Sequence, residues 1–387
     1  MNNRGAIIIG GDYQGLGIAR GLCRENIPVC VIDNDFSISR FSKCSKYYFT
    51  CPPIREESSF IKFLLGISSY GLKGWVVFPT SDYGVSVISR YKSQLEAFYR
   101  IPTPSWQITK CFYDKRFTYH LAEKIGIDFP KTWIAPSIEE IGRLELPFPV
   151  IIKPAILDKF YPYTKTKIFL AINRKELLKA YDKAVNIVDP SEIIIQEVIP
   201  GRPDFLFSLA AFFKNGQLMA RLVVKRSRQH PMDFGHASTF VETVDIPELE
   251  ILGEKLLAAA GYYGLAEVEF KFDSRDGKYK LLEVNPRTWG WHSIGLRAGV
   301  NFPLILFRDI LGEEVEINSF SRGVKWIRII TDLPVVTREL LMGTLNIKDV
   351  LNSLKGEKEF AVFSCSDPFP FIAEFFLLPY LWRKRGF

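Results

Sequence analysis

Two short stretches of the chain carry side chains that suit metal-assisted phosphate chemistry. Alternating apolar and polar residues around Glu269 and around Glu283 predict two β-strands joined by a turn at residues 274–277. Residues two apart on a strand share a face, so pairing residue 269 with residue 283 places Glu269, Glu283 and Asn285 together. Such hard oxygen ligands suit Mg²⁺, and Arg287 just beyond them suits a developing phosphoryl or acyl charge. The alternative is an amphipathic hairpin whose polar face meets water.

Two lysines are candidates for binding phosphate. Lys115 lies near the start of a predicted helix, and Lys153 ends the apolar stretch 148–152 and is followed by a proline. A lysine held at a strand end is a point charge that suits phosphate oxygens. A solvated surface lysine is the alternative at each position.

A third stretch suits a nucleoside. Gln196, Glu197 and Ile199 end an apolar strand and offer polar groups, backbone amides and an apolar side chain for an adenine ring. Asp204 follows closely enough to reach a ribose hydroxyl. The alternative is an ordinary strand-to-turn transition.

Four further cationic or titratable residues are weaker candidates for binding a substrate carboxylate. Arg226 and Arg228 belong to the densest basic cluster before the tail, and His292 and Arg297 follow the metal candidates. Cations beside an acidic metal site fit a triphosphate or a carboxylate. For Arg226 and Arg228 the alternative is a solvated strand end, and for His292 it is packing among aromatic residues.

The elements that position these residues indicate an α/β protein. Apolar strands at 6–9, 28–33 and 74–79 alternate with helical segments, which predicts a Rossmann-like parallel sheet layer. The glycines after the first strand do not have dinucleotide-binding spacing, so tight strand-to-helix packing is favoured there, although Asp33 stands where a ribose ligand would. Four regions are expected: an N-terminal α/β domain at 1–105, a small lobe with a flap at 106–200, a large lobe with the metal site at 201–315, and a C-terminal segment at 316–387.

Composition narrows the class of protein. The 387 residues suggest two or three domains, and a net charge of +7 is dispersed rather than gathered into a nucleic-acid motif. The six cysteines form no C-x-x-C pair, so neither a zinc site nor a redox pair is indicated. Without a signal-peptide pattern, we expect a cytoplasmic protein that binds no nucleic acid.

The tail from Pro370 to Arg385 combines aromatic residues with a basic end. Such a segment suits peripheral contact with an anionic membrane surface. Because Glu374 and two prolines interrupt the pattern, a segment packed on the protein or on a second subunit of a homo-oligomer is the favoured alternative.

Taken in order, these motifs resemble those of the ATP-grasp superfamily, over residues 1–315. Within it, stretches 226–235 and 282–290 are similar to carboxylate–amine ligases of the D-aspartate ligase type. The resemblance implies a two-lobed ATP-grasp domain after the α/β layer. The implied cofactors are ATP and Mg²⁺, with Mn²⁺ as an alternative ion.

The resemblance also implies roles for the matching residues. By this resemblance, Lys115 and Lys153 would bind phosphate. Adenine and ribose would be bound by Gln196, Glu197, Ile199 and Asp204. The metal ion would be bound by Glu269, Glu283 and Asn285. The catalytic residues would be Arg287 and Lys153. The stretch 155–170 departs from the family because it lacks the glycines of the usual flap.

The function that follows is an ATP-dependent ligase that forms an amide through an acylphosphate, joining a small-molecule or cell-envelope carboxylate to an amine. Three alternatives stay open: a carboxylase-type enzyme of the same superfamily, a nicotinamide-dependent oxidoreductase that uses the N-terminal glycines, and a non-catalytic nucleotide-binding protein.

Overall fold

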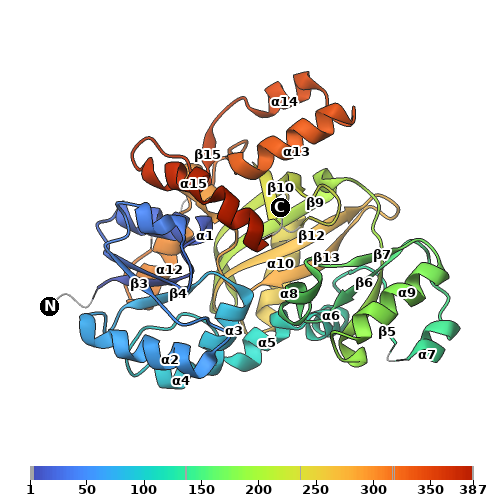
Figure 1. The fold of residues 1–387 in the computed structure, drawn as a ribbon, viewed down its shortest axis with the longest axis horizontal. Coiled ribbons are helices and arrows are strands. Elements are labelled where there is room, and N and C mark those ends of the chain that lie inside the picture. The colour runs from blue at the N-terminus through green and yellow to red at the C-terminus, as the bar shows by residue number, and fades with distance from the viewer. Residues whose placement is uncertain (1–3, 136, 236, 316, 318, 386–387) are drawn as a thin grey trace.

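The computed structural model describes residues 4–135, 137–235, 237–315, 317 and 319–385. Their strands form three sheets (Figure 1), with strand orders β3-β2-β1-β4, β5-β8-β6-β7 and β13-β12-β9-β10-β11-β14-β15. No helix among these residues meets the length and apolarity needed to cross a membrane.

The N-terminal layer is the expected parallel sheet. Its strands are β1 (Ala6–Ile9), β2 (Val29–Asp33), β3 (Tyr47–Thr50) and β4 (Val76–Pro79). Its main helices are α1 (Tyr13–Cys23), α2 (Glu57–Gly66), α3 (Asp82–Arg90) and α4 (Lys92–Leu95). Alternate side chains of β1 enter two different hydrophobic cores, Ala6 and Ile8 in one and Ile7 and Ile9 in the other. A strand covered on both faces must be apolar throughout, which explains the continuous run.

The glycines after β1 allow helix α1 to pack closely on the sheet. Gly10 has φ +98°, and a Cβ on Gly15 would lie 2.1 Å from the Gly10 carbonyl oxygen. The Asp33 carboxylate accepts the Gly11 amide at 2.7 Å. The local contacts are therefore those of strand-to-helix packing.

The small lobe is an antiparallel sheet with helices on one face. Its strands are β5 (Thr132–Ile134), β6 (Val150–Pro154), β7 (Phe169–Ala171) and β8 (Ile193–Glu197). Helices α7 (Ile138–Arg143) and α9 (Arg174–Val185) cover one face, where Val150 and Ile152 are buried. The alternation of β6 turns Ile151 and Lys153 to the other face, which lines a cavity. Helices α5 (Trp106–Tyr113) and α6 (Lys115–Lys124) join this lobe to the N-terminal layer.

The large sheet carries the predicted hairpin. Its strands are β9 (Leu206–Lys214), β10 (Gln217–His230), β11 (Ala237–Val244), β12 (Gly264–Asp273), β13 (Lys278–Asn285), β14 (Lys325–Ile327) and β15 (Lys358–Phe360). Helix α10 (Pro247–Ala259) buries Leu249, Leu256 and Leu257 against one face. Because β14 pairs with β11, this sheet continues past the boundary expected at residue 315.

The remaining helices belong to several parts of the fold. They are α8 (Tyr161–Thr164), α11 (Gly295–Ala298), α12 (Phe302–Ile310), α13 (Ile329–Leu341), α14 (Ile347–Ser353) and α15 (Phe369–Arg385). Helix α15, red in Figure 1, lies against the N-terminal layer, where Arg20 of α1 forms a buried ion pair with Asp367 at 3.0 Å.

Candidate active site between two lobes

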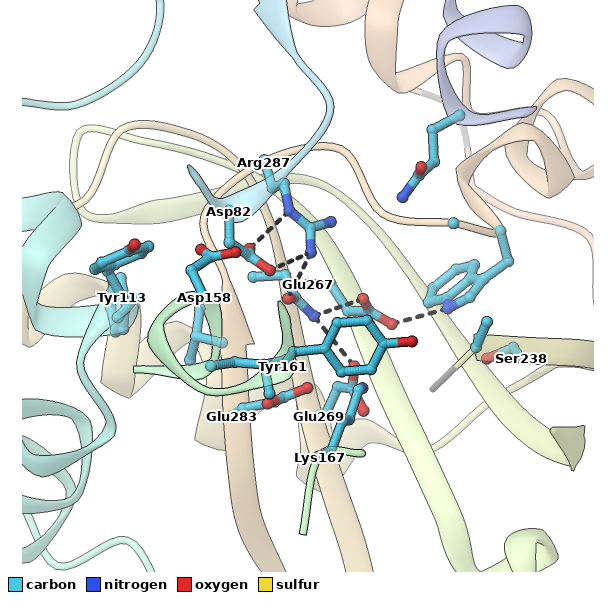
Figure 2. Close-up of a pocket in the computed structure, with 18 of the residues that line it drawn as sticks. Asp82, Tyr113, Asp158, Tyr161, Lys167, Ser238, Glu267, Glu269, Glu283 and Arg287 are labelled. Carbon is cyan, nitrogen blue, oxygen red and sulfur yellow. Dashed lines mark hydrogen bonds and ion pairs between the residues drawn. The ribbon is translucent and has the colours of Figure 1, made fainter. Parts of the chain in front are cut away.

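The hairpin of β12 and β13 brings the predicted metal ligands together. Glu269 pairs with Glu283, the register expected from the sequence, and Glu267 pairs with Asn285. The Asn285 carboxamide donates to Glu269 Oε1 at 3.1 Å and to Glu267 Oε2 at 2.9 Å. The carboxylates project from neighbouring strands toward one cavity (Figure 2).

Two cations form ion pairs with these carboxylates. Lys115 Nζ lies 3.0 Å from Glu283 Oε2, and the Arg226 guanidinium lies 2.9 Å from Glu269 Oε2. Burial alone would raise the pKa of Glu283, but the combined charges of Lys115, Lys167 and Lys153 outweigh burial and hold that pKa well below its usual range. Burial likewise acts to lower the pKa of Lys115, yet Glu283 holds it above its ordinary value. Both groups therefore stay charged at neutral pH.

Glu267 is a site residue that the sequence analysis missed. It is buried and accepts the Trp291 indole N–H at 2.8 Å besides the Asn285 amide. Burial, with the charge of Glu269, raises the pKa of Glu267 to about 8. The signal was present in the sequence, because Glu267 lies two residues before Glu269 and so shares its face.

The donor set fits a hard divalent cation that is also held by phosphates. Within the described residues, no group of three or more His, Cys, Asp or Glu side chains is arranged to hold a metal by itself. Mg²⁺ is commonly bound by one or two carboxylates together with substrate phosphates. Glu269, Glu283 and the Asn285 Oδ1 atom supply donors of that kind, with Lys115 and Arg226 beside them.

Arg287 lies at the same cavity and is anchored from another layer. Its guanidinium donates to both carboxylate oxygens of Asp82, at 2.7 Å and 2.9 Å, and to Asn285 Oδ1 at 3.1 Å. Figure 2 shows Asp82 facing this guanidinium. Asp82 begins α3 of the N-terminal layer, so that layer forms one wall of the cavity.

Two cavities meet at the carboxylates of Glu269 and Glu283. The first, of about 330 Å³, is lined by Tyr13, Asp82, Asp158, Trp291 and Arg287 among others. The second, of about 510 Å³, lies between the two lobes. They share six lining residues, which are Lys115, Leu157, Lys167, Arg226, Glu269 and Glu283. A ligand in one cavity can therefore contact a ligand in the other across the carboxylates.

The second cavity contains most of the predicted nucleotide-binding residues. Lys115, Lys153, Gln196, Glu197 and Ile199 all line it. The ammonium of Lys153 donates to the Tyr119 hydroxyl at 2.8 Å, which fixes its direction.

The polar side chains at the end of β8 are already paired. Gln196 donates to Thr132 Oγ1 at 2.8 Å. Glu197 accepts the Lys131 amide at 2.8 Å and the Arg275 guanidinium at 3.0 Å. At these positions the backbone rather than the side chain is the group to consider for an adenine edge.

The stretch 155–170 contributes lining residues to both cavities and lacks the glycines of a typical flap. It forms a 3₁₀ turn at Leu157–Lys159 and the short helix α8. Asp158, Tyr161 and Lys167 line the first cavity, and Lys167, Ile168 and Leu170 line the second. Burial, with the charge of Asp82, raises the pKa of Asp158 to about 6.

The structure does not bring four of the predicted residues to either cavity. Arg228 instead forms a buried bidentate pair with Asp332 of α13, at 2.8 Å and 2.7 Å. Arg297 is exposed on α11. Asp204 lies in the turn Pro203–Phe205, and neither cavity includes it among its lining residues.

His292 is the fourth of these residues. It is buried, its Nε2 lies 2.9 Å from the Gln14 carbonyl oxygen, and burial lowers its pKa to about 4. A neutral, packed imidazole accounts for its contacts and offers no charge to a carboxylate.

Comparisons with known proteins find a matching family model and a curated relative. Residues 191–330 match the family model described as ATP-grasp in the biosynthetic pathway with Ter operon. The chain is 26% identical to D-aspartate ligase of Enterococcus faecium over 304 residues, which is 73% of this chain and 70% of that protein.

Solved structures show the same fold. The L-amino acid ligase of Bacillus licheniformis aligns with a TM-score of 0.60 and 17% identity, over 80% of this chain and 75% of that one. The biotin carboxylase domain of Hydrogenobacter thermophilus 2-oxoglutarate carboxylase, solved with MgADP and bicarbonate, gives a TM-score of 0.66 and 15% identity, over 83% of this chain and 73% of that one.

Proposed function

We propose that this ATP-grasp protein is a carboxylate–amine ligase, which uses ATP and Mg²⁺ to form an amide through an acylphosphate. The observation that carries the proposal is the meeting of two cavities at Glu269 and Glu283. One cavity has the lobe walls and lysines for a nucleotide. The other has cations and aromatic residues for a second substrate beside the same carboxylates.

The first step transfers the terminal phosphate. An oxygen of the donor carboxylate attacks the γ-phosphorus, the bond to the ADP oxygen breaks, and an acylphosphate forms. Lys115 and Lys153 bind phosphate oxygens, and Arg226 and Arg287 offset the charge of the transferring group. Glu269, Glu283 and Asn285 would hold Mg²⁺, which would supply further positive charge to the phosphates.

The second step forms the amide. The amine nitrogen attacks the acyl carbon, the carbon–oxygen bond to phosphate breaks, inorganic phosphate leaves, and the nitrogen loses a proton. Arg287 lies on the first cavity, where it can steady the acylphosphate. Because acylphosphates hydrolyse readily, residues 155–170 would serve by keeping water out of the site.

Carboxylase-type chemistry is the second candidate. It is favoured by the structural likeness to the biotin carboxylase domain solved with bicarbonate. In that reaction bicarbonate takes the place of the donor carboxylate. The two reactions differ in which small molecule the release of ADP requires.

The test is ADP release from Mg²⁺-ATP with pools of amino acids, sugar acids and amines, and separately with bicarbonate. We expect release that needs both a carboxylate and an amine and is lost in Glu283→Ala. Glu248→Ala is the matched control, because Glu248 is an exposed glutamate of α10. ADP release supported by bicarbonate alone would favour the carboxylase proposal over the ligase proposal. If ATP with Mg²⁺ did not raise the thermal stability of the protein, both proposals would be contradicted.

A further inference from the structure

The last helix exposes an apolar face. Phe369, Ile372, Phe375, Phe376 and Tyr380 recur at helical spacing along α15, and Phe369 and Phe376 are 65% and 82% exposed. The opposite side of the helix packs on the protein, where Ala373 and Glu374 are buried. The first turns of α15 are thus packed on the protein, while large apolar side chains of the helix are exposed.

A second segment with exposed aromatic residues packs against this helix. The residues around the turn Ile38–Phe41 expose Phe36 and Phe41, and this turn packs against α15. Both ends of the contact are fixed by hydrogen bonds. Asp367 accepts from the Ser42 hydroxyl at 2.7 Å and the Lys43 amide at 3.1 Å, while the Tyr380 hydroxyl donates to the Asp35 carboxylate.

Basic side chains are exposed in the same two segments. Arg40, Lys43 and Lys46 are exposed on the N-terminal segment, and Arg383 is exposed on α15. The guanidinium of Arg40 stacks over the Phe36 ring at 4.9 Å. We call the exposed apolar and basic residues of 36–46 and of 369–383 the aromatic–basic face.

We propose that the aromatic–basic face binds the surface of an anionic lipid bilayer. Aromatic side chains partition favourably into the headgroup region, and cations beside them are attracted to anionic lipids. A second copy of this chain fits less well, because the same cations would face one another across a symmetric contact. Since one side of α15 is packed on the protein, the helix would lie along the membrane surface.

The experiment is co-sedimentation with vesicles of phosphatidylcholine alone or mixed with phosphatidylglycerol. We expect the chain to sediment only with the mixed vesicles and to be released as salt is raised, because the charge attraction is screened. Phe376→Ser should lower the partition coefficient roughly tenfold, the loss expected for one large apolar side chain. Lys43→Glu should also lower it and reduce the dependence on salt.

The matched control is Leu341→Ser, because Leu341 of α13 is 84% exposed but lies outside the aromatic–basic face. It should bind as the wild type does. Absence of binding to mixed vesicles, or equal binding by Phe376→Ser, would overturn the proposal. So would a concentration-dependent dimer that Phe376→Ser abolishes, because the face would then be an interface between copies. Circular dichroism verifies that each variant is folded.

Discussion

The Asp82 carboxylate holds the Arg287 guanidinium in a bidentate ion pair, at 2.7 Å and 2.9 Å. Asp82 belongs to the N-terminal layer, while Arg287 follows the last strand of the hairpin that carries the metal candidates. The pair therefore links the position of the N-terminal layer to the residue proposed to meet the reacting phosphate. We infer that Asp82 is a positioning residue.

Asp82→Asn should lower kcat about tenfold with little change in KM for ATP, because Arg287 loses its ionic anchor but the nucleotide cavity is untouched. The decisive measurement is a double-mutant cycle with Arg287→Ala. We expect Asp82→Asn to cost little further activity in the Arg287→Ala background. Fully additive losses would show that Asp82 acts independently of Arg287.

Lys153→Met should weaken ATP binding roughly tenfold or more, because the buried ammonium that we propose to bind phosphate is lost. Tyr119→Phe should weaken it by a smaller factor, since it removes only the 2.8 Å bond that directs the lysine. Isothermal titration with a non-hydrolysed ATP analogue measures both. Lys175→Met, at an exposed lysine of α9, is the control, and an equal effect there would contradict the assignment.

Glu267→Gln should raise the Mg²⁺ concentration needed for half-maximal activity about tenfold, because Glu267 orients the Asn285 carboxamide. The expected signature is selective: saturating Mg²⁺ restores much of the lost rate. A loss of rate that no concentration of Mg²⁺ recovers would argue for a direct role of Glu267 in the reaction. Titration of activity against Mg²⁺ at fixed ATP distinguishes the two outcomes.

The buried His292 side chain should make the protein less stable in acid. Its pKa is lowered to about 4 by burial, so below the unfolded value near 6.5 the unfolded chain binds a proton that the folded chain excludes. Stability should therefore fall as the pH drops from about 6.5 to 4, by up to about 3 kcal/mol from this residue. The unfolding temperature should fall less steeply with decreasing pH in His292→Gln than in the wild type. Parallel curves of unfolding temperature against pH for the two proteins would contradict the interpretation.

Local alternation explains why much of the site could be predicted from the sequence. Period-two patterns placed Glu269, Glu283 and Asn285 on one face, and the register of β12 and β13 follows from burying Val268 and Val284. The same rule would have found Glu267. The parallel N-terminal sheet could be predicted from continuous apolar runs, because a strand that is buried on both faces needs apolar residues throughout.

Contacts between distant segments explain what the sequence could not predict. Asp82 is 205 positions from Arg287, and no local pattern marks it as the partner. Arg228 was expected near substrate because it lies in a basic cluster, but Asp332 of α13, 104 positions later, holds it in the interior. Such pairings depend on how the layers pack, which residue spacing does not encode.

The most direct test of the ligase mechanism follows oxygen atoms. The donor carboxylate, once identified by ADP release, is labelled with oxygen-18 and incubated with the enzyme, Mg²⁺-ATP and the amine. If the carboxylate attacks ATP and the amine then displaces phosphate from the acylphosphate, one labelled oxygen must pass to inorganic phosphate for each amide formed. We predict that mass spectrometry will find singly labelled phosphate in equal amount to the amide. Amide formation with unlabelled phosphate would contradict the account.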